Sequence, residues 1–167
     1  MLKLTHKNRL FLLSLLVLFL FTSCSTKKNT ILSRTYHGVT AKYNGYFNAK
    51  LRVKDGAERL ASQHEDKYDR VLKIYKHADP QKAKSIFPDM DEAIKKTSVV
   101  IKRHSMVIGG KERNKWIDDT WLLMGKAQFY KHDFFTALET FQFVASAYKD
   151  NEIKYEALLW VMKTNLE

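Results

Sequence analysis

The sequence predicts an all-α protein. Apolar and aromatic residues recur in steps of three and four over most of the chain, which is the spacing of one helical face. The chain contains only two prolines and six glycines, and strand signals are weak. In its last third, residues 34 positions apart agree in character, as Trp121 and Tyr155 do. A repeat of this length predicts stacked antiparallel helical hairpins, the beginning of an α-solenoid.

The chain begins with the layout of a bacterial lipoprotein signal peptide over residues 1–23. Three basic residues precede an apolar run, 10–21, which is shorter than the roughly 20 residues that a transmembrane helix needs. Two small residues then precede Cys24, the only cysteine of the chain. We therefore expect cleavage before Cys24 and acylation of its thiol, although Phe21 stands where the usual signal has leucine. The alternative is an ordinary secretory signal followed by an accidental cysteine.

The mature chain, residues 24–167, is distinctly basic. Removal of the signal leaves 26 of the 29 basic residues against 18 acidic residues, a net charge of +8. On an exported, membrane-tethered protein this charge favours phosphate headgroups and anionic partners, and we expect no nucleic acid partner. An apolar content of 45% for the whole chain is typical of a packed domain rather than a disordered tether.

The first part of the mature chain is expected to be a tether followed by a helical hairpin. Residues 24–30, with Cys24, are polar and short enough to hold the fold within about 20 Å of the membrane. Helical spacing then runs through 31–48 and again through 50–63, so two helices are expected to pair as a divergent hairpin over 31–63. One face of the first helix carries the large apolar residues Leu32, Tyr36, Val39, Tyr43, Tyr46 and Phe47.

Residues 64–115 are expected to be irregular at first and then to form a basic helix. Residues 71–75 fit a short extended stretch, without a firm assignment. Pro88 and the carboxylates after it indicate a helix start, because proline suits the first turn and negative charge suits the positive end of the helix dipole. This helix is expected to end near His104, before a loop that contains two glycines.

Residues 116–167 are the most regular part of the chain. Helices are expected over 117–130, over 134–148 and from 152 to the end, joined by tight polar turns. The first two helices follow the tetratricopeptide pattern, in which an aromatic residue, an apolar residue with glycine, and after the turn an aromatic residue, alanine and phenylalanine recur. The residues in these places are Trp121, Met124, Gly125, Phe134, Ala137 and Phe141. The last repeat is incomplete, so either the protein is longer or its last helix docks on another chain.

A partner groove is predicted on the concave side of these repeats. The candidates are first-helix residues, which by the tetratricopeptide likeness are Asp119, Leu122, Lys126, Phe129, Tyr130, Glu156 and Trp160. They suit an extended or helical peptide. The alternative is that they pack on neighbouring units of the same solenoid, because such repeats need stacking partners.

A second candidate site is a basic run that is expected to face anionic lipid or an acidic partner. It comprises Lys95, Lys96, Lys102, Arg103, Lys111, Arg113 and Lys115. A solvated helix face is the alternative explanation. The sequence shows no catalytic or metal-binding motif at its proper spacing, so neither an enzyme nor a cofactor is expected beyond the lipid on Cys24.

Residues shortly after Cys24 carry a family resemblance. Arg34-Thr35-Tyr36-His37, Thr40-Ala41-Lys42-Tyr43-Asn44 and Tyr46-Phe47-Asn48 resemble the start of the SprE/PorW lipoproteins of the Bacteroidota. Those are long tetratricopeptide lipoproteins of type IX secretion and gliding motility, so the chain is similar to an amino-terminal portion of one. The resemblance implies a scaffold on the outer membrane that faces the periplasm and binds components of the secretion apparatus.

The residues just after Cys24 bear on which side of the outer membrane the chain faces. Surface-exposed lipoproteins of the Bacteroidota carry acidic residues there, whereas Ser25-Thr26-Lys27-Lys28 has none, which favours periplasmic exposure. Two alternatives stay open. One is a lipoprotein of the outer-membrane barrel assembly machinery, and the more distant one is a periplasmic cell-wall enzyme.

Overall fold

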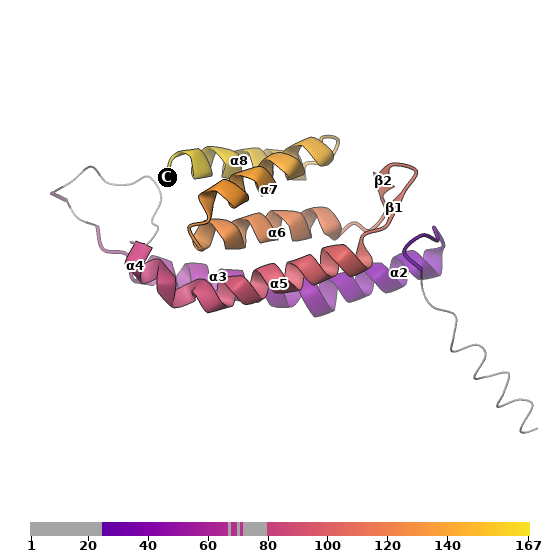
Figure 1. The fold of residues 1–167 in the computed structure, drawn as a ribbon, viewed down its shortest axis with the longest axis horizontal. Coiled ribbons are helices and arrows are strands. Elements are labelled where there is room, and N and C mark those ends of the chain that lie inside the picture. Colours follow the sequence, from indigo (N-terminus) through magenta and orange to yellow (C-terminus); the bar gives the residue numbers. More distant parts are fainter. Residues whose placement is uncertain (1–24, 67, 70, 72–79) are drawn as a thin grey trace, which may run out of the picture.

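The computed structural model describes residues 25–66, 68–69, 71 and 80–167. These residues are mostly helical, so the all-α prediction is confirmed for them. The helices stack in tiers, with the amino-terminal helices along one edge and the carboxy-terminal helices along the other (Figure 1). The expected signal peptide, Cys24 and most of the stretch 71–75 lie outside the described residues.

The amino-terminal region forms one long helix and not a hairpin. Helix α2 (Ile31–Thr40), a π-helical segment η1 (Ala41–Tyr46) and helix α3 (Phe47–Ser62) follow one another without a break. Thr30 caps the start, where its side chain accepts a hydrogen bond from the Ser33 N–H (3.2 Å). The hairpin predicted over 31–63 is therefore wrong, because nothing in these residues interrupts the helical backbone.

This long helix buries a face that is small or polar in its first half and more apolar in its second half. That face contains Ser33, His37, Ala41, Ala49, Val53, Gly56 and Leu60. A Cβ added at Gly45 would overlap Val100 of the facing helix, and one added at Gly56 would lie 2.6 Å from Met90 Cε. Small side chains thus permit the two helices to approach closely, while most of the large apolar residues point outward.

The facing helix agrees with the sequence prediction. A short helix α4 (Pro80–Ala83) and a 3₁₀ turn η2 (Lys84–Ile86) lead into α5 (Phe87–His104), which starts and ends where expected. Asp89 in its first turn pairs with Arg52 (2.7 Å) and Arg59 of α3. The paired arginines lower the pKa of Asp89, with the hydrogen bond from Arg52 as the largest cause.

A small antiparallel hairpin connects the two halves of the chain. Strands β1 (Val107–Ile108) and β2 (Lys111–Glu112) pair across Gly109 and Gly110, whose φ angles are 61° and 72°. Two successive positive φ angles are the requirement of the tightest hairpin turns, which explains the glycine pair.

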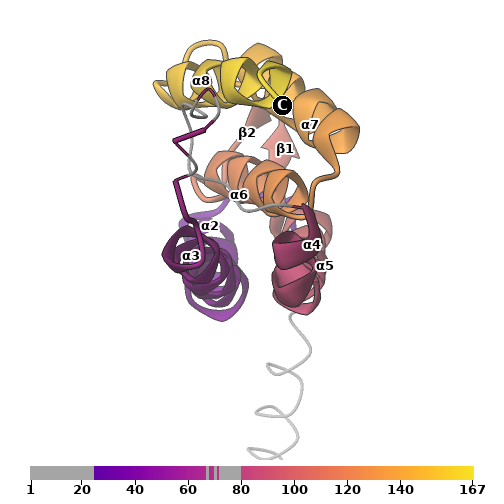
Figure 2. The same cartoon turned by 90° about the vertical axis from the view of Figure 1, so that its left-hand side faces the viewer.

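The last three helices are confirmed within a residue or two. They are α6 (Ile117–Tyr130), α7 (Phe134–Ala147) and α8 (Ile153–Asn165). Asp133 caps α7 by accepting from Thr136. A Cβ at Gly125 would lie 2.6 Å from the Phe141 ring, so the glycine permits the close contact of α6 with α7. Seen end-on, α3 and α5 lie side by side at the bottom of the stack, α6 lies above them, and α7 and α8 form the top (Figure 2).

Candidate functional site

The predicted partner groove is largely filled by its own side chains. Leu122, Phe129 and Trp160 are only 3%, 4% and 8% exposed and pack with Phe141 in one core cluster. The prediction that these three face a free concave surface is wrong, because α8 stacks on α6 and α7 and buries them in the contact between the helices. The structure does bring the predicted residues together, but mainly as a packed interface between helices.

The polar members of that set hold α6 and α8 together. Lys126 Nζ lies 2.6 Å from Glu156 Oε1 and 5.4 Å from the centre of the Trp160 ring. Burial raises the pKa of Asp119, and nearby Asp118 and Glu156 add to the effect. Burial also raises the pKa of Tyr130, which packs edge-on against Phe129 and Trp160. These groups stabilise the stack and leave little of the groove open to a peptide.

The outer face of α8 is uncovered in the described chain. It is defined here by Tyr155, Leu158, Leu159 and Met162, which are between 46% and 65% exposed. The opposite face of α8, with Ala157 and Trp160, is buried on α6 and α7. A helix that is apolar on both sides is typical of a position between two partners.

Three of the four positions of this outer face correspond, 34 residues earlier, to positions on α6 that contact α7. The ring centre of Trp121, which is equivalent to Tyr155, lies 4.8 Å from the ring centre of Phe143 on α7. Gly125, equivalent to Leu159, contacts Phe141 of α7. Gln128, equivalent to Met162, accepts a hydrogen bond from Thr140 of α7 (2.8 Å). On α8 the same places therefore present apolar side chains without the covering helix.

The predicted basic run comes from two elements. Lys95, Lys102 and Arg103 are exposed on α5, and Glu92 lies 3.2 Å from Lys96 and 4.0 Å from Lys95. The remaining three basic residues, Lys111, Arg113 and Lys115, belong to β2 and the loop after it and are exposed. Of all seven, only Arg113 and Lys115 line the pocket described next.

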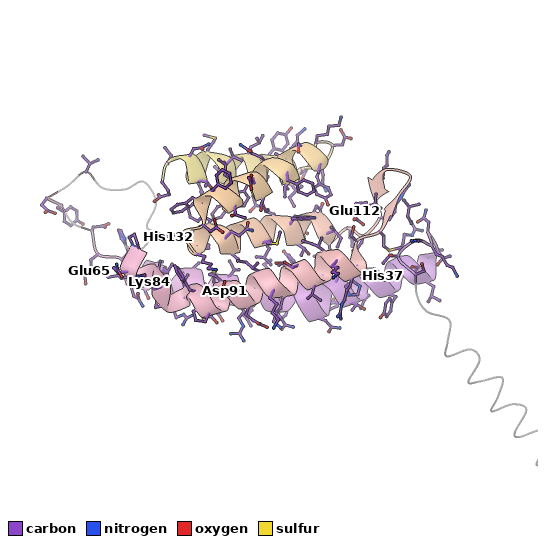
Figure 3. All side chains as sticks on the ribbon, viewed as in Figure 1. His37, Glu65, Lys84, Asp91, Glu112 and His132 are labelled. Carbon is purple, nitrogen blue, oxygen red and sulfur yellow. The ribbon has the colours of Figure 1, made fainter. Side chains whose placement is uncertain are left out.

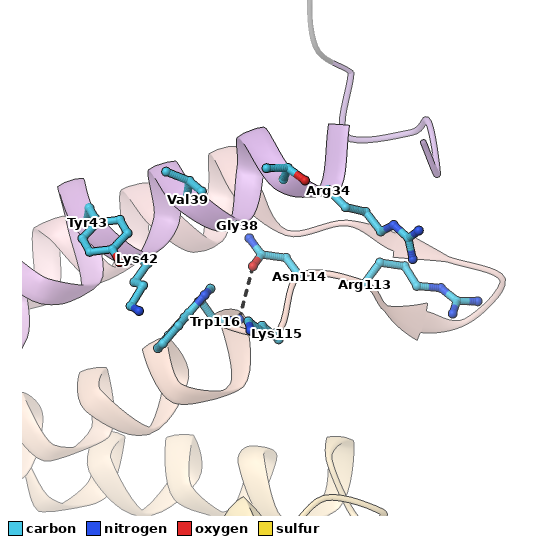
Figure 4. A pocket seen from close by; sticks show the side chains of 10 residues that line it. Arg34, Gly38, Val39, Lys42, Tyr43, Arg113, Asn114, Lys115 and Trp116 are labelled. Atoms are coloured by element: carbon cyan, nitrogen blue, oxygen red, sulfur yellow. Dashed lines mark hydrogen bonds between the residues drawn. The ribbon is translucent and has the colours of Figure 1, made fainter. Parts of the chain in front are cut away.

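A basic pocket of about 420 Å³ lies between the long helix and the loop that precedes α6. Its charged lining residues are Arg34, Lys42, Arg113 and Lys115, and no carboxylate lines it. Arg34 and Lys42 lie on either side of Gly38 on one helical face, and Trp116 forms the floor at the start of α6 (Figure 4). None of the four cations has a carboxylate within ion-pair distance among the residues that the structure describes.

Buried hydrogen bonds fix the loop that carries half of this pocket. Asn114, only 2% exposed, donates from Nδ2 to the carbonyls of His104 (2.9 Å) and His37 (3.3 Å) and accepts from the Trp116 N–H (3.2 Å). Glu112 accepts from Ser105 Oγ (2.6 Å) and from the backbone N–H groups of Met106 and Asn114 (2.8 and 2.9 Å). With Glu112 and Asn114 turned inward, the residues between and after them face the pocket.

The two lysines of the pocket lie over aromatic rings, and its two arginines extend toward one edge. Lys42 Nζ lies 4.8 Å from the Tyr43 ring centre and 4.7 Å from that of Trp116. Figure 4 shows Arg34 and Arg113 extending toward the same edge of the pocket. Two like charges from distant parts of the chain, without a carboxylate between them, form a site that suits an oxyanion.

An apolar stripe runs along the long helix beside this pocket. It is defined by Leu32, Tyr36, Val39, Tyr43, Phe47 and Leu51, which are between 48% and 75% exposed. Val39 and Tyr43 also line the basic pocket. The sequence predicts all of these residues except Leu51 as one helical face, but it does not identify Arg34 and Lys42 as a site. Their spacing of eight residues on one helical face was the available signal.

Titratable side chains are spread over the molecule rather than gathered in one centre. Figure 3 places His37 and Glu112 near one end and Glu65 and Lys84 near the other. Across the part of the chain that the structure describes, no three His, Cys, Asp or Glu residues are arranged to hold a metal ion. No helix in the same part is long and apolar enough to cross a membrane.

Two histidines meet beneath the pocket. Nδ1 of His37 and Nδ1 of His104 are 3.0 Å apart, so one nitrogen donates and the other accepts. Burial lowers the pKa of His104, and the nearby His37 and Arg103 lower it further. Both effects disfavour a positive charge on His104 in the folded protein.

A comparison of the chain with models of protein families and with curated protein sequences found no match.

Proposed function

We propose that this protein is a lipid-anchored scaffold of the outer membrane that faces the periplasm and binds protein partners of type IX secretion and gliding motility. Its helices are of the tetratricopeptide type, and the anchor is a lipid on Cys24. The sequence motifs and the family resemblance support the anchor and the setting. The stacking of α6, α7 and α8, with Gly125 against Phe141, supports the repeat type.

The observation that carries the scaffold function is the equivalence of α6 and α8. At the positions where α6 meets α7, α8 exposes Tyr155, Leu159 and Met162. A monomeric soluble protein rarely leaves such a contiguous apolar face uncovered unless it binds something. The occupant we propose is an amphipathic helix of a partner protein that lies antiparallel to α8, as α7 lies on α6.

The contact between α6 and α7 also predicts which side chains that helix carries. On α6 the glycine at position 125 admits the ring of Phe141 from α7. At the equivalent position α8 has Leu159, whose side chain would meet a ring placed as Phe141 is in the first pair. The partner helix therefore carries a small residue opposite Leu159 and apolar residues one turn to either side.

Site-directed crosslinking in the producing cell tests this function. A photo-reactive amino acid at Leu159 is expected to capture a component of the secretion or motility apparatus, whereas the same group at exposed Gln142 of α7 does not. A second substitution, Tyr155→Glu, is expected to abolish the crosslink. Capture of a barrel assembly protein instead would show that the chain serves that machinery, and equal capture from both positions would refute a docking face on α8.

The anchor has its own test. The Cys24→Ala variant is expected to be lost from outer-membrane fractions, because a single site of acylation is removed. A variant that stays with the outer membrane would contradict the lipid anchor while leaving the crosslinking result untouched.

A further inference from the structure

The apolar stripe of the long helix has no covering partner in the described chain. Its six residues follow one another in steps of three and four, so they form one continuous band. The band contains three aromatic residues, Tyr36, Tyr43 and Phe47. An exposed apolar band of this extent marks a surface that contacts another apolar phase or another protein.

The charges beside the band indicate which of these it contacts. The four cations of the basic pocket have no carboxylate lining residue to neutralise them. Arginine guanidinium groups match the oxygens of a phosphate, and Tyr43 and Trp116 are the residue types that lie at the headgroup level of a bilayer. A helix with an apolar face and adjacent basic residues is the typical design for binding in the plane of an anionic membrane.

The start of the described chain lies beside the same helix. Ser33 Oγ donates to the carbonyl of Ser25 (2.8 Å), so the polar tether folds back on the first turn of α2. Ser25 directly follows Cys24, the predicted acylation site. The described chain therefore starts beside the first turn of α2, at one end of the band.

We infer that the apolar stripe and the basic pocket together form a membrane-contact surface, with the stripe at the acyl boundary and the pocket on the phosphate of an anionic phospholipid. The position of this surface rests on the proposed lipid anchor. The long helix then lies along the bilayer, and α8, on the opposite edge of the stack in both Figure 1 and Figure 2, points away from it. One chain thus separates a lipid-facing edge from a partner-facing edge.

Depth-dependent quenching tests this surface in the full acylated chain. Because acylation occupies the only native cysteine, a cysteine introduced by Phe47→Cys carries a single bimane label. Leu158→Cys on α8 is the matched control, since Phe47 is 56% and Leu158 48% exposed. In vesicles of phosphatidylethanolamine and phosphatidylglycerol with brominated acyl chains, the label from Phe47→Cys is expected to be quenched several-fold more than the control, at a depth of about 5–10 Å.

The charged part of the surface has a second comparison. Arg34→Ala with Arg113→Ala is expected to reduce the quenching of the label at position 47 several-fold, and replacing phosphatidylglycerol by phosphatidylcholine is expected to do the same. Lys149→Ala with Lys154→Ala removes the same charge near the start of α8 and is expected to leave the quenching unchanged.

Three results would overturn the inference. The first is equal quenching of the labels at positions 47 and 158, and the second is quenching at position 47 that the arginine substitutions do not change. The third is protection of the label at position 47 from both lipid and aqueous quenchers, which would mean that protein covers the stripe. Failure of the anchor itself looks different, because an unacylated Cys24 would take up a second bimane label and the chain would wash off the vesicles at high salt.

Discussion

The long helix of residues 31–62 and helix α6 each pair with the following helix, yet they place their large side chains in opposite ways. Helix α6 buries Leu122 and Phe129, whereas the long helix buries Ser33, His37 and Ala41 and exposes Tyr43 and Phe47. Regular apolar spacing therefore identifies a helical face, but it does not decide whether that face is buried in its own fold. The exposed face must be explained by what lies outside the described residues.

The largest expected effect separates the two kinds of aromatic residue. Phe141→Ala removes a fully buried ring, and we expect a loss of about 3–5 kcal/mol in the free energy of unfolding. Phe47→Ala removes a ring that is mostly in solvent, so we expect a change within about 0.5 kcal/mol. Chemical denaturation of the full chain in a non-ionic detergent measures both. Similar losses for the two variants would mean that the stripe is part of the folded core.

The next effect tests a feature that the two helices share. A methyl group at Gly125 meets the ring of Phe141, and one at Gly45 meets Val100. Gly125→Ala and Gly45→Ala are each expected to cost about 1–3 kcal/mol of stability, because neighbouring side chains must shift. The control is Ala61→Gly on the exposed end of α3, because a substitution at Gly110 would be strained by its positive φ. This control is expected to cost about 1 kcal/mol of stability from helix propensity alone. Thermal unfolding that is unaffected by Gly45→Ala would refute the close packing of the long helix on α5.

The junction between the two regions depends on Asn114. Asn114→Ala removes the buried side-chain donor to the carbonyls of His37 and His104, and we expect a loss of about 1–3 kcal/mol in the free energy of unfolding. Asn48→Ala, which removes an exposed bond to the Asn44 carbonyl, is the matched control with a change near zero. Equal losses in denaturant titrations would show that the loop before α6 is not held by this network.

The smallest effect is a dependence on pH. Because the pKa of His104 is lowered in the folded protein, the unfolded chain binds the proton more readily at pH values below about 6.5. The contribution of His104 to the free energy of unfolding is therefore complete above that pH. This contribution is lost as the pH falls through the pKa of His104 in the folded protein. Denaturation midpoints measured between neutral and mildly acidic pH are expected to fall less steeply in His104→Gln, and an unchanged slope would exclude the histidine pair as the cause.

The sequence predicts the helices from α5 onward because their boundaries carry local signals. Pro88 stands in the first turn of α5, and Asp133 caps α7 with its side chain. The tetratricopeptide pattern also singles out Gly125 and Phe141, which the structure places against each other. Local chemistry and a repeat period are thus enough to define this half of the fold.

The sequence does not predict the long helix as one element, nor the basic pocket. Residues 48–50 carry no helix breaker, so the two predicted helices continue into one another. The pocket joins Arg34 and Lys42 to Arg113 and Lys115 across some 70 residues of chain, and only the packing of α2 on α5 brings them together. Likewise, burial of Leu122 and Trp160 depends on the stacking of α8, which spacing cannot reveal.

A distance between two spin labels tests the central claim, that residues 31–62 form one continuous helix with its apolar face outward. Labels introduced by Tyr36→Cys and Ala61→Cys, in a chain with Cys24→Ser, lie on exposed positions of α2 and α3. At 1.5 Å per residue, a continuous helix predicts a separation of about 37 Å between the labelled Cα positions. A paired hairpin over 31–63 would bring them to about 10 Å, and that result would contradict the account.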